Sequence, residues 1–161
     1  MSGGWWIVAG FSIALATAIA LAFKPLRKML RETEFARAQR EFRLRREHLE
    51  AKFYELAAAS GKPRWLRWVD CEFDDDVTYA RDRQSGRLAA FVGITVSFEP
   101  VEGGLMEDVE AVGDLRAATA VFLLRRGVWS SDGRVMFNLN PAEAIAYYHQ
   151  RLEKVGDLSR R

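Results

Sequence analysis

The sequence predicts an α+β protein, in which an N-terminal transmembrane helix and a long helical stalk precede a bent antiparallel sheet of four to five strands. The sheet packs on a helix, and a C-terminal helix follows it. Three observations predict this fold. Residues 5–23 form an uncharged apolar run, residues 26–59 contain neither proline nor glycine, and two strand–turn–strand patterns follow. Of the 161 residues, those beyond an anchor and a stalk suffice for one small globular domain.

The apolar run WWIVAGFSIALATAIALAF has nineteen residues, close to the roughly 20 that cross a bilayer once. A cleaved secretory signal is the alternative, because alanines near the end of the run resemble cleavage positions. Residues 1–4 carry no basic side chain, however, and the run is longer than the apolar core of a signal peptide. An uncleaved anchor therefore fits better, with its edges at Trp5, Trp6, Phe23 and Lys24.

Basic residues are concentrated directly after this run. Residues 24–47 contain nine basic residues and four glutamates. The positive-inside rule therefore places the N-terminus outside and the C-terminal domain in the cytoplasm. Membrane lipid is the predicted partner of the basic segment, and a solvated helix face or nucleic acid are the weaker alternatives. The predicted contacts with anionic lipid are Lys24, Arg27, Lys28 and Arg31.

Small residues recur at intervals of four within the predicted span. This spacing lets two helices approach closely and predicts a homo-oligomer formed through the span. The alternative is that alanine is simply frequent in this run. The predicted helix-packing face consists of Gly10, Ala14, Ala18 and Ala22.

Residues 24–48 are predicted to form a basic juxtamembrane helical stalk, and residues 49–156 the α+β domain. Phe35, Phe42, Leu49 and Leu56 recur every seven residues, which favours a coiled coil only weakly because charged residues occupy companion positions. The first helix of the domain presents an apolar stripe for a sheet to cover, formed by Leu49, Phe53, Leu56 and Ala57.

Strand patterns begin after Gly61 and Pro63, which end that helix. Residues 65–73 predict a first strand, and residues 77–83 and 87–99 a hairpin that turns at residues 84–86. Gly93 predicts a bulge or bend in the long second arm. Residues 115–124 and 128–139 predict a second hairpin, which turns at Arg126 and Gly127 and is interrupted at Asp132 and Gly133.

Residues 100–114 predict an exposed loop with a short strand near residues 109–112. A final helix is predicted from Pro141, with Asn140 as its cap, Glu143 completing a capping box, and Gly156 at its end. Its buried stripe is predicted to be Ile145, Tyr148 and Leu152, and residues 157–161 should fray.

A helix across a bent antiparallel sheet resembles the cystatin-like and NTF2-like arrangements. The likeness rests on the helix ending at Ala59, the long arm around Gly93 and the closing hairpin RRGVWSSDGRVMF. The chain lacks the two extra helices that precede the sheet in the usual NTF2-like pattern. The whole chain is similar to short single-pass bacterial membrane proteins of unknown function, and the likeness assigns no functional residue.

Chemical motifs are sparse. The densest carboxylate cluster lacks the pattern of a Ca²⁺ loop and is interpreted as a polar turn; it comprises Asp70, Glu72, Asp74, Asp75 and Asp76. The two histidines, His48 and His149, are far apart in the sequence. The single cysteine, Cys71, has no motif partner and is expected to be a small buried side chain. We therefore predict no catalytic residue, metal site or cofactor.

Three function classes are compatible with these patterns. The first is a membrane-tethered interaction or scaffold module for an unknown protein partner. The second is a small-ligand or catalytic pocket on the concave face of the sheet, and the third is an oligomeric structural membrane protein. Polar groups converging inside a pocket would favour the second class.

Overall fold

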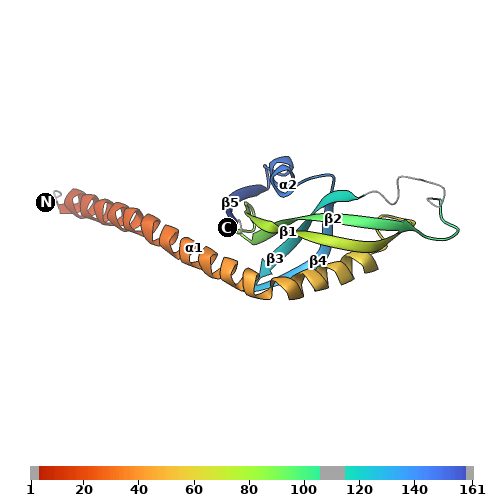
Figure 1. The fold of residues 1–161 in the computed structure, drawn as a ribbon. Coiled ribbons are helices and arrows are strands. Elements are labelled where there is room, and N and C mark those ends of the chain that lie inside the picture. The colour runs from red at the N-terminus through yellow and green to blue at the C-terminus, as the bar shows by residue number, and fades with distance from the viewer. Residues whose placement is uncertain (1–3, 106–114, 159–161) are drawn as a thin grey trace. The chain divides into compact units, whose positions relative to one another are not determined.

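The computed structural model describes residues 4–105 and 115–158, with side chains described in residues 29–105 and 115–157. The chain divides into two compact units, residues 1–43 and 44–161. Helix α1 covers Gly4–Ala59 and is followed by strands β1 (Leu66–Asp82), β2 (Leu88–Pro100), β3 (Arg116–Arg125) and β4 (Val128–Phe137), helix α2 (Pro141–Tyr147) and strand β5 (Leu152–Leu158). The strands form one antiparallel sheet in the order β4-β3-β2-β1-β5 (Figure 1). The predicted α+β class and antiparallel sheet are confirmed.

The predicted membrane span lies in the part of helix α1 whose side chains are outside the described residues. Among the side chains that are described, no helix combines the length and apolar character that a membrane crossing needs. The predicted short strand near residues 109–112 also lies outside the described part of the chain.

The last turns of helix α1, from residue 44 on, pack on one face of the sheet (Figure 1). Phe53 is fully buried, and its ring lies 5.7 Å from those of Phe73 in β1 and Phe122 in β3, measured between centroids. Leu49 and Ala57 are also buried, and Leu56 is half-buried. The apolar stripe predicted for this helix therefore meets the sheet, as its spacing requires.

Strand β1 is continuous, which corrects the prediction of two separate strands at residues 65–73 and 77–83. The register jumps from Phe73 opposite Ile94 to Val77 opposite Val92, so Asp74, Asp75 and Asp76 bulge opposite the single residue Gly93. The predicted irregularity therefore lies in β1, next to Gly93. A Cβ atom on Gly93 would overlap the Asp74 carboxylate, which explains why glycine fits there.

Arg46 of helix α1 holds this bulge in place. Its guanidinium donates to the backbone carbonyls of Asp74 and Asp75 and pairs with Glu50 at 2.5 Å. These bonds satisfy carbonyls that the bulge removes from the β1–β2 ladder. The same helix thus covers the sheet face and supports its irregular edge.

The second predicted hairpin is confirmed in strands β3 and β4. Arg126 and Gly127 both have positive φ angles, 51° and 78°, which is typical of a type I′ turn. The predicted interruption at Asp132 and Gly133 is a bulge, because the register jumps from Phe122 opposite Ser131 to Ala120 opposite Val135. A Cβ atom on Gly133 would lie 2.8 Å from the backbone of helix α1 at Leu56 and Ala57. Glycine at this position therefore lets the helix approach β4 closely.

The prediction of a helix reaching Gly156 is wrong. The capping box of Asn140 and Glu143 is present, but helix α2 ends at Tyr147. The chain then turns, and Leu152–Leu158 pairs with the C-terminal half of β1 as strand β5. Of the predicted stripe, Ile145 is buried whereas Tyr148 is exposed. Pairing with an open sheet edge satisfies backbone groups that a longer helix would have satisfied internally.

Helix α2 covers part of the sheet face that helix α1 leaves uncovered. Side chains alternate between the two faces of a strand, so Ala89 and Phe91 face away from Phe53. They form a second buried cluster with Ala80, Val121, Ala144 and Ile145. Each face of the sheet therefore has its own core.

Because Gly133 combines a positive φ of 70° with a close helix backbone, we predict that Gly133→Ala destabilises the fold more than Gly127→Ala does. Gly127 has a φ of 78° but no atom within 4 Å of the place that an alanine methyl group would take, so it isolates the cost of the backbone angle. The overlap with helix α1 should add about 1–3 kcal/mol. Denaturant unfolding of the full-length protein in detergent, followed by tryptophan fluorescence, measures the free energy of unfolding of both variants. Equal losses of free energy in the two variants would contradict the close approach of α1 and β4.

Candidate functional site

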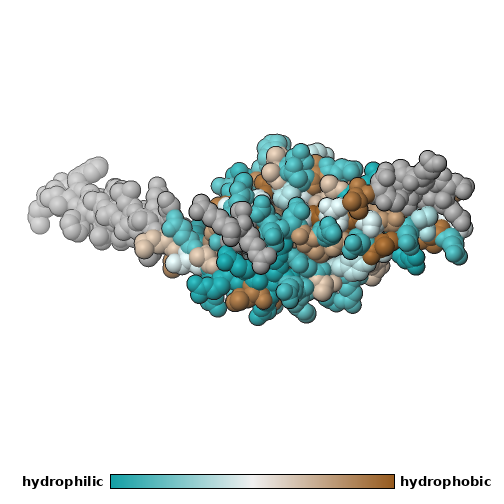
Figure 2. All heavy atoms as spheres, in the orientation of Figure 1, coloured by the Kyte–Doolittle hydropathy of each residue, from teal (hydrophilic) through white to brown (hydrophobic). Residues whose placement is uncertain are grey.

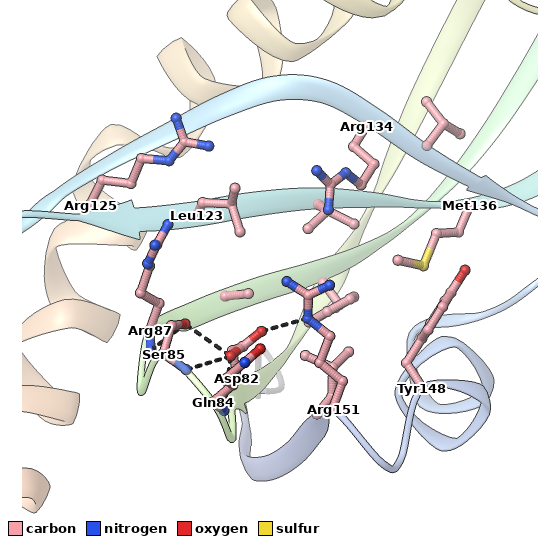
Figure 3. A pocket seen from close by; sticks show the side chains of 15 residues that line it. Asp82, Gln84, Ser85, Arg87, Leu123, Arg125, Arg134, Met136, Tyr148 and Arg151 are labelled. Carbon is pink, nitrogen blue, oxygen red and sulfur yellow. Dashed lines mark hydrogen bonds and ion pairs between the residues drawn. The ribbon is translucent and has the colours of Figure 1, made fainter.

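A cavity of about 760 Å³ lies on the sheet face opposite helix α1. Its walls come from the β1–β2 turn, the start of β2, the end of β3, strand β4 and the link between α2 and β5 (Figure 3). The size is in the range of small-molecule sites, roughly 300–1,000 Å³. All these segments belong to the unit formed by residues 44–161.

The floor of the cavity is apolar. Ala89 and Phe91 of β2 and Val121 of β3 belong to the buried cluster under helix α2. Leu123 and Met136 also line the cavity and are only half-buried. The floor therefore offers apolar surface to a molecule inside the cavity.

The rim of the cavity is strongly basic. Arg87 comes from the residue before β2, Arg125 from β3, Arg134 from β4 and Arg151 from the segment before β5 (Figure 3). Asp82 is the one carboxylate in the described lining. Four guanidinium groups around one carboxylate leave a net positive charge at the mouth of the cavity.

Asp82 organises the β1–β2 turn and holds Arg151. One carboxylate oxygen accepts from the backbone and hydroxyl of Ser85, at 2.7 and 2.9 Å, and the other accepts from Arg151 Nε at 2.7 Å. The hydrogen bond from Arg151 and those from Ser85 hold the pKa of Asp82 well below its usual value. Asp82 therefore neutralises Arg151 over the whole physiological pH range.

Arg87 directly precedes β2 and Arg125 is the last residue of β3, so both lie at the same end of two paired strands. The last pair of the β2–β3 ladder is Ala89 with Leu123, two residues from each arginine. Like charges at such positions repel each other. Among the residues that the structure describes, neither guanidinium has a carboxylate partner, whereas Arg134 pairs with Asp132 at 3.3 Å.

Outside this cavity, one face of the described surface is seen in Figure 2. Figure 2 shows hydrophilic residues over most of the described surface in view, with hydrophobic residues in separate groups between them. Single exposed hydrophobic residues are normal for a folded protein. The cavity is therefore the candidate site.

Most residues predicted from the sequence to bind lipid or a second helix lie outside the described side chains. Of that set, the side chain of Arg31 is described, and it is exposed on helix α1. The others belong to the span edges, the helix-packing face and the lipid contacts; they are Trp5, Trp6, Gly10, Ala14, Ala18, Ala22, Phe23, Lys24, Arg27 and Lys28.

The carboxylate cluster and Cys71 are the main chemical candidates in the sequence. Within the described residues, no three histidine, cysteine or acidic side chains are grouped so as to hold a metal ion. Burial, followed by the charges of Asp70 and Glu50, raises the pKa of the Cys71 thiol to about 12. The thiol is thus protonated at neutral pH, which is unsuited to a nucleophile.

Sequence reasoning missed the basic rim. Its arginines are far apart in the chain and meet only through the strand register and the turn after α2. One signal was available in the predicted hairpins, because Arg87 alternates with Ala89 and Phe91 on one strand and Arg125 with Leu123 and Val121 on another.

Comparison with known proteins adds no assignment, because no protein-family model, curated protein or solved structure matches this chain.

We predict that Asp82→Asn lowers the free energy of unfolding at neutral pH, because the amide loses the charge that pairs with Arg151. A depressed native-state pKa gives stability that is complete above the unfolded-state value, 3.8, and is lost as the pH falls below it. The gap between wild type and Asp82→Asn should therefore stay constant from neutral pH to about pH 4 and narrow below it. Denaturant unfolding at several pH values measures the gap, with Glu102→Gln on an exposed loop as the control; a gap that widens in acid would contradict this role.

Proposed function

We propose that this protein is a membrane-tethered binding module that holds a small anionic ligand in the cavity above Leu123 and Met136. The observation that carries the proposal is the placement of Arg87 and Arg125 at one end of that cavity, with no carboxylate partner in the described part of the chain. An anion would relieve the repulsion between the two guanidinium groups.

The other walls support the same proposal. The apolar floor suits the organic part of a ligand, and the guanidinium donors on the rim suit its charged group. Arginine also presents its donors in a planar fork that matches carboxylate, sulfonate and phosphate oxygens. Among the function classes that the sequence leaves open, the apolar floor and basic rim of the cavity favour the small-ligand pocket.

The membrane tether is a separate part of the proposal and rests on the sequence. The uncharged run from Trp5 to Phe23 suits a single span, and the basic residues after it favour a cytoplasmic domain.

The helix laid across an antiparallel sheet also supports a cystatin-like or NTF2-like arrangement as the finer description of the fold.

The cavity is tested by isothermal titration calorimetry of the full-length protein in phosphatidylcholine nanodiscs with naphthalene-2-carboxylate. We expect saturable binding that weakens by about tenfold or more in Arg125→Gln, the effect of one lost charge-assisted hydrogen bond. Leu123→Trp should also weaken binding, because the larger side chain fills the floor. Empty nanodiscs give the background heat.

Arg64→Gln is the matched control, because it removes the same charge from an exposed position just before β1, whereas the cavity lies at the far end of that strand. It should bind the probe like wild type. Absence of binding to wild type, or equal weakening in Arg64→Gln and Arg125→Gln, would overturn the proposed site.

The tether predicts that a C-terminal tag stays with the membrane fraction after an alkaline wash and resists external protease until the membrane is opened. Ala14→Arg places a charge in the middle of the span, which costs about 2.5–3.5 kcal/mol on insertion scales, and should release the protein from the membrane. A wild-type protein in the soluble fraction would refute the span. Cleavage of the tag on intact cells would refute the orientation.

A further inference from the structure

We infer that the ligand is a phosphate monoester, with its phosphate between Arg87 and Arg125 and its apolar part on Leu123 and Met136. The inference rests on the proposed function, since it names the chemistry of the ligand in the same cavity. It follows from which rim arginines lack a carboxylate partner and from the apolar floor beside them.

The four rim arginines differ in how their charges are compensated. Asp82 compensates Arg151 through a 2.7 Å bond, and Asp132 lies 3.3 Å from Arg134. Arg87 and Arg125 have no carboxylate partner among the described residues. The charged group of a ligand is therefore drawn to Arg87 and Arg125.

Two guanidinium groups carry two positive charges, which two negative charges on a ligand would neutralise. A carboxylate or sulfonate carries one charge and leaves one arginine uncompensated, whereas a phosphate monoester carries about 1.5 to 2 negative charges at pH 7. Its three terminal oxygens can also accept from two forks at once. Among common biological anions, the phosphate monoester matches both the charge and the donors of this pair.

The apolar floor defines the rest of the ligand. Leu123 lies on the same strand face as Arg125, two residues away, and Leu123 and Met136 are half-buried. Inorganic phosphate would leave this surface exposed to water, so an apolar group attached to the phosphate should add affinity. Such a group occurs in soluble phosphate esters and in phosphomonoester lipids, and both sources share the same head chemistry.

The test compares 2-naphthyl phosphate with naphthalene-2-sulfonate on the full-length protein in phosphatidylcholine nanodiscs, because the two probes have the same apolar body. At about pH 7.5, where the phosphate is a dianion, we expect the phosphate to bind about tenfold or more tightly than the sulfonate. At about pH 5 the phosphate should lose about tenfold in affinity, as the dianion fraction falls across a pKa near 6.

The sulfonate controls for protein groups near the cavity. The charged and titratable groups of the protein act on both probes; they are Asp82, Asp132, the rim arginines and His149 beside Tyr148. A pH-dependent loss of affinity seen only with the phosphate therefore comes from titration of the phosphate itself. Arg87→Gln and Arg125→Gln should each remove most of the preference for phosphate over sulfonate. Arg64→Gln should retain it.

Equal affinities of the phosphate and the sulfonate would overturn the phosphate inference but leave the proposed function standing, because anions still bind. Failure of every probe, including naphthalene-2-carboxylate, would overturn both. Vesicles of phosphatidylcholine containing phosphatidic acid identify the source. If they displace 2-naphthyl phosphate where phosphatidylcholine alone does not, the ligand is a lipid headgroup; if they do not displace it, the ligand is a soluble phosphate ester.

Discussion

The packing of Phe53 between Phe73 and Phe122 fixes how the last turns of helix α1 lie on the sheet, and the other features of this unit depend on it. With that face covered, the residues that alternate with it are left for a second core. The two bulges fit the same constraint. Gly133 lets β4 approach the helix backbone, and Arg46 of the helix bonds the carbonyls of the β1 bulge. One helix thus determines both the closed face of the sheet and the face on which the cavity lies.

The cavity exists because helix α2 is short. It has seven residues and buries Ala144 and Ile145 against the second face, while Leu123 and Met136 beyond it are only half-buried. A helix continuing to Gly156 would follow a different path from the observed chain, which turns at Tyr148 and pairs with β1. That turn also brings Arg151 to Asp82. The wrong prediction for the C-terminus therefore also hid the contribution of Arg151 to the cavity rim.

Features specified by neighbouring residues can be predicted from the sequence, and features that depend on distant pairing cannot. The turn at Arg126 and Gly127 and the cap at Asn140 are local, and the sequence predicts both. The sequence pattern divides strand β1 in two because three consecutive aspartates are poor strand formers. In the structure, the residues before and after these aspartates both pair with β2, and this pairing keeps β1 continuous. Strand β5 depends on an open edge of β1, which no local pattern reveals.

The charges on the cavity rim are not needed to form the sheet. Pairing of Ala89 with Leu123 and of Phe91 with Val121 already fixes the register of β2 and β3, and burial of these side chains stabilises it. Arg87 and Arg125 lie next to the end of this ladder without a carboxylate partner among the described residues, whereas the nearby Asp82 and Arg151 show how a compensated pair is built on the same rim. Under the proposed function, a bound anion would pair with both guanidinium groups and stabilise the folded state by its own binding free energy. The apolar pairs thus account for the sheet, and the two arginines are left for the role that we propose for them.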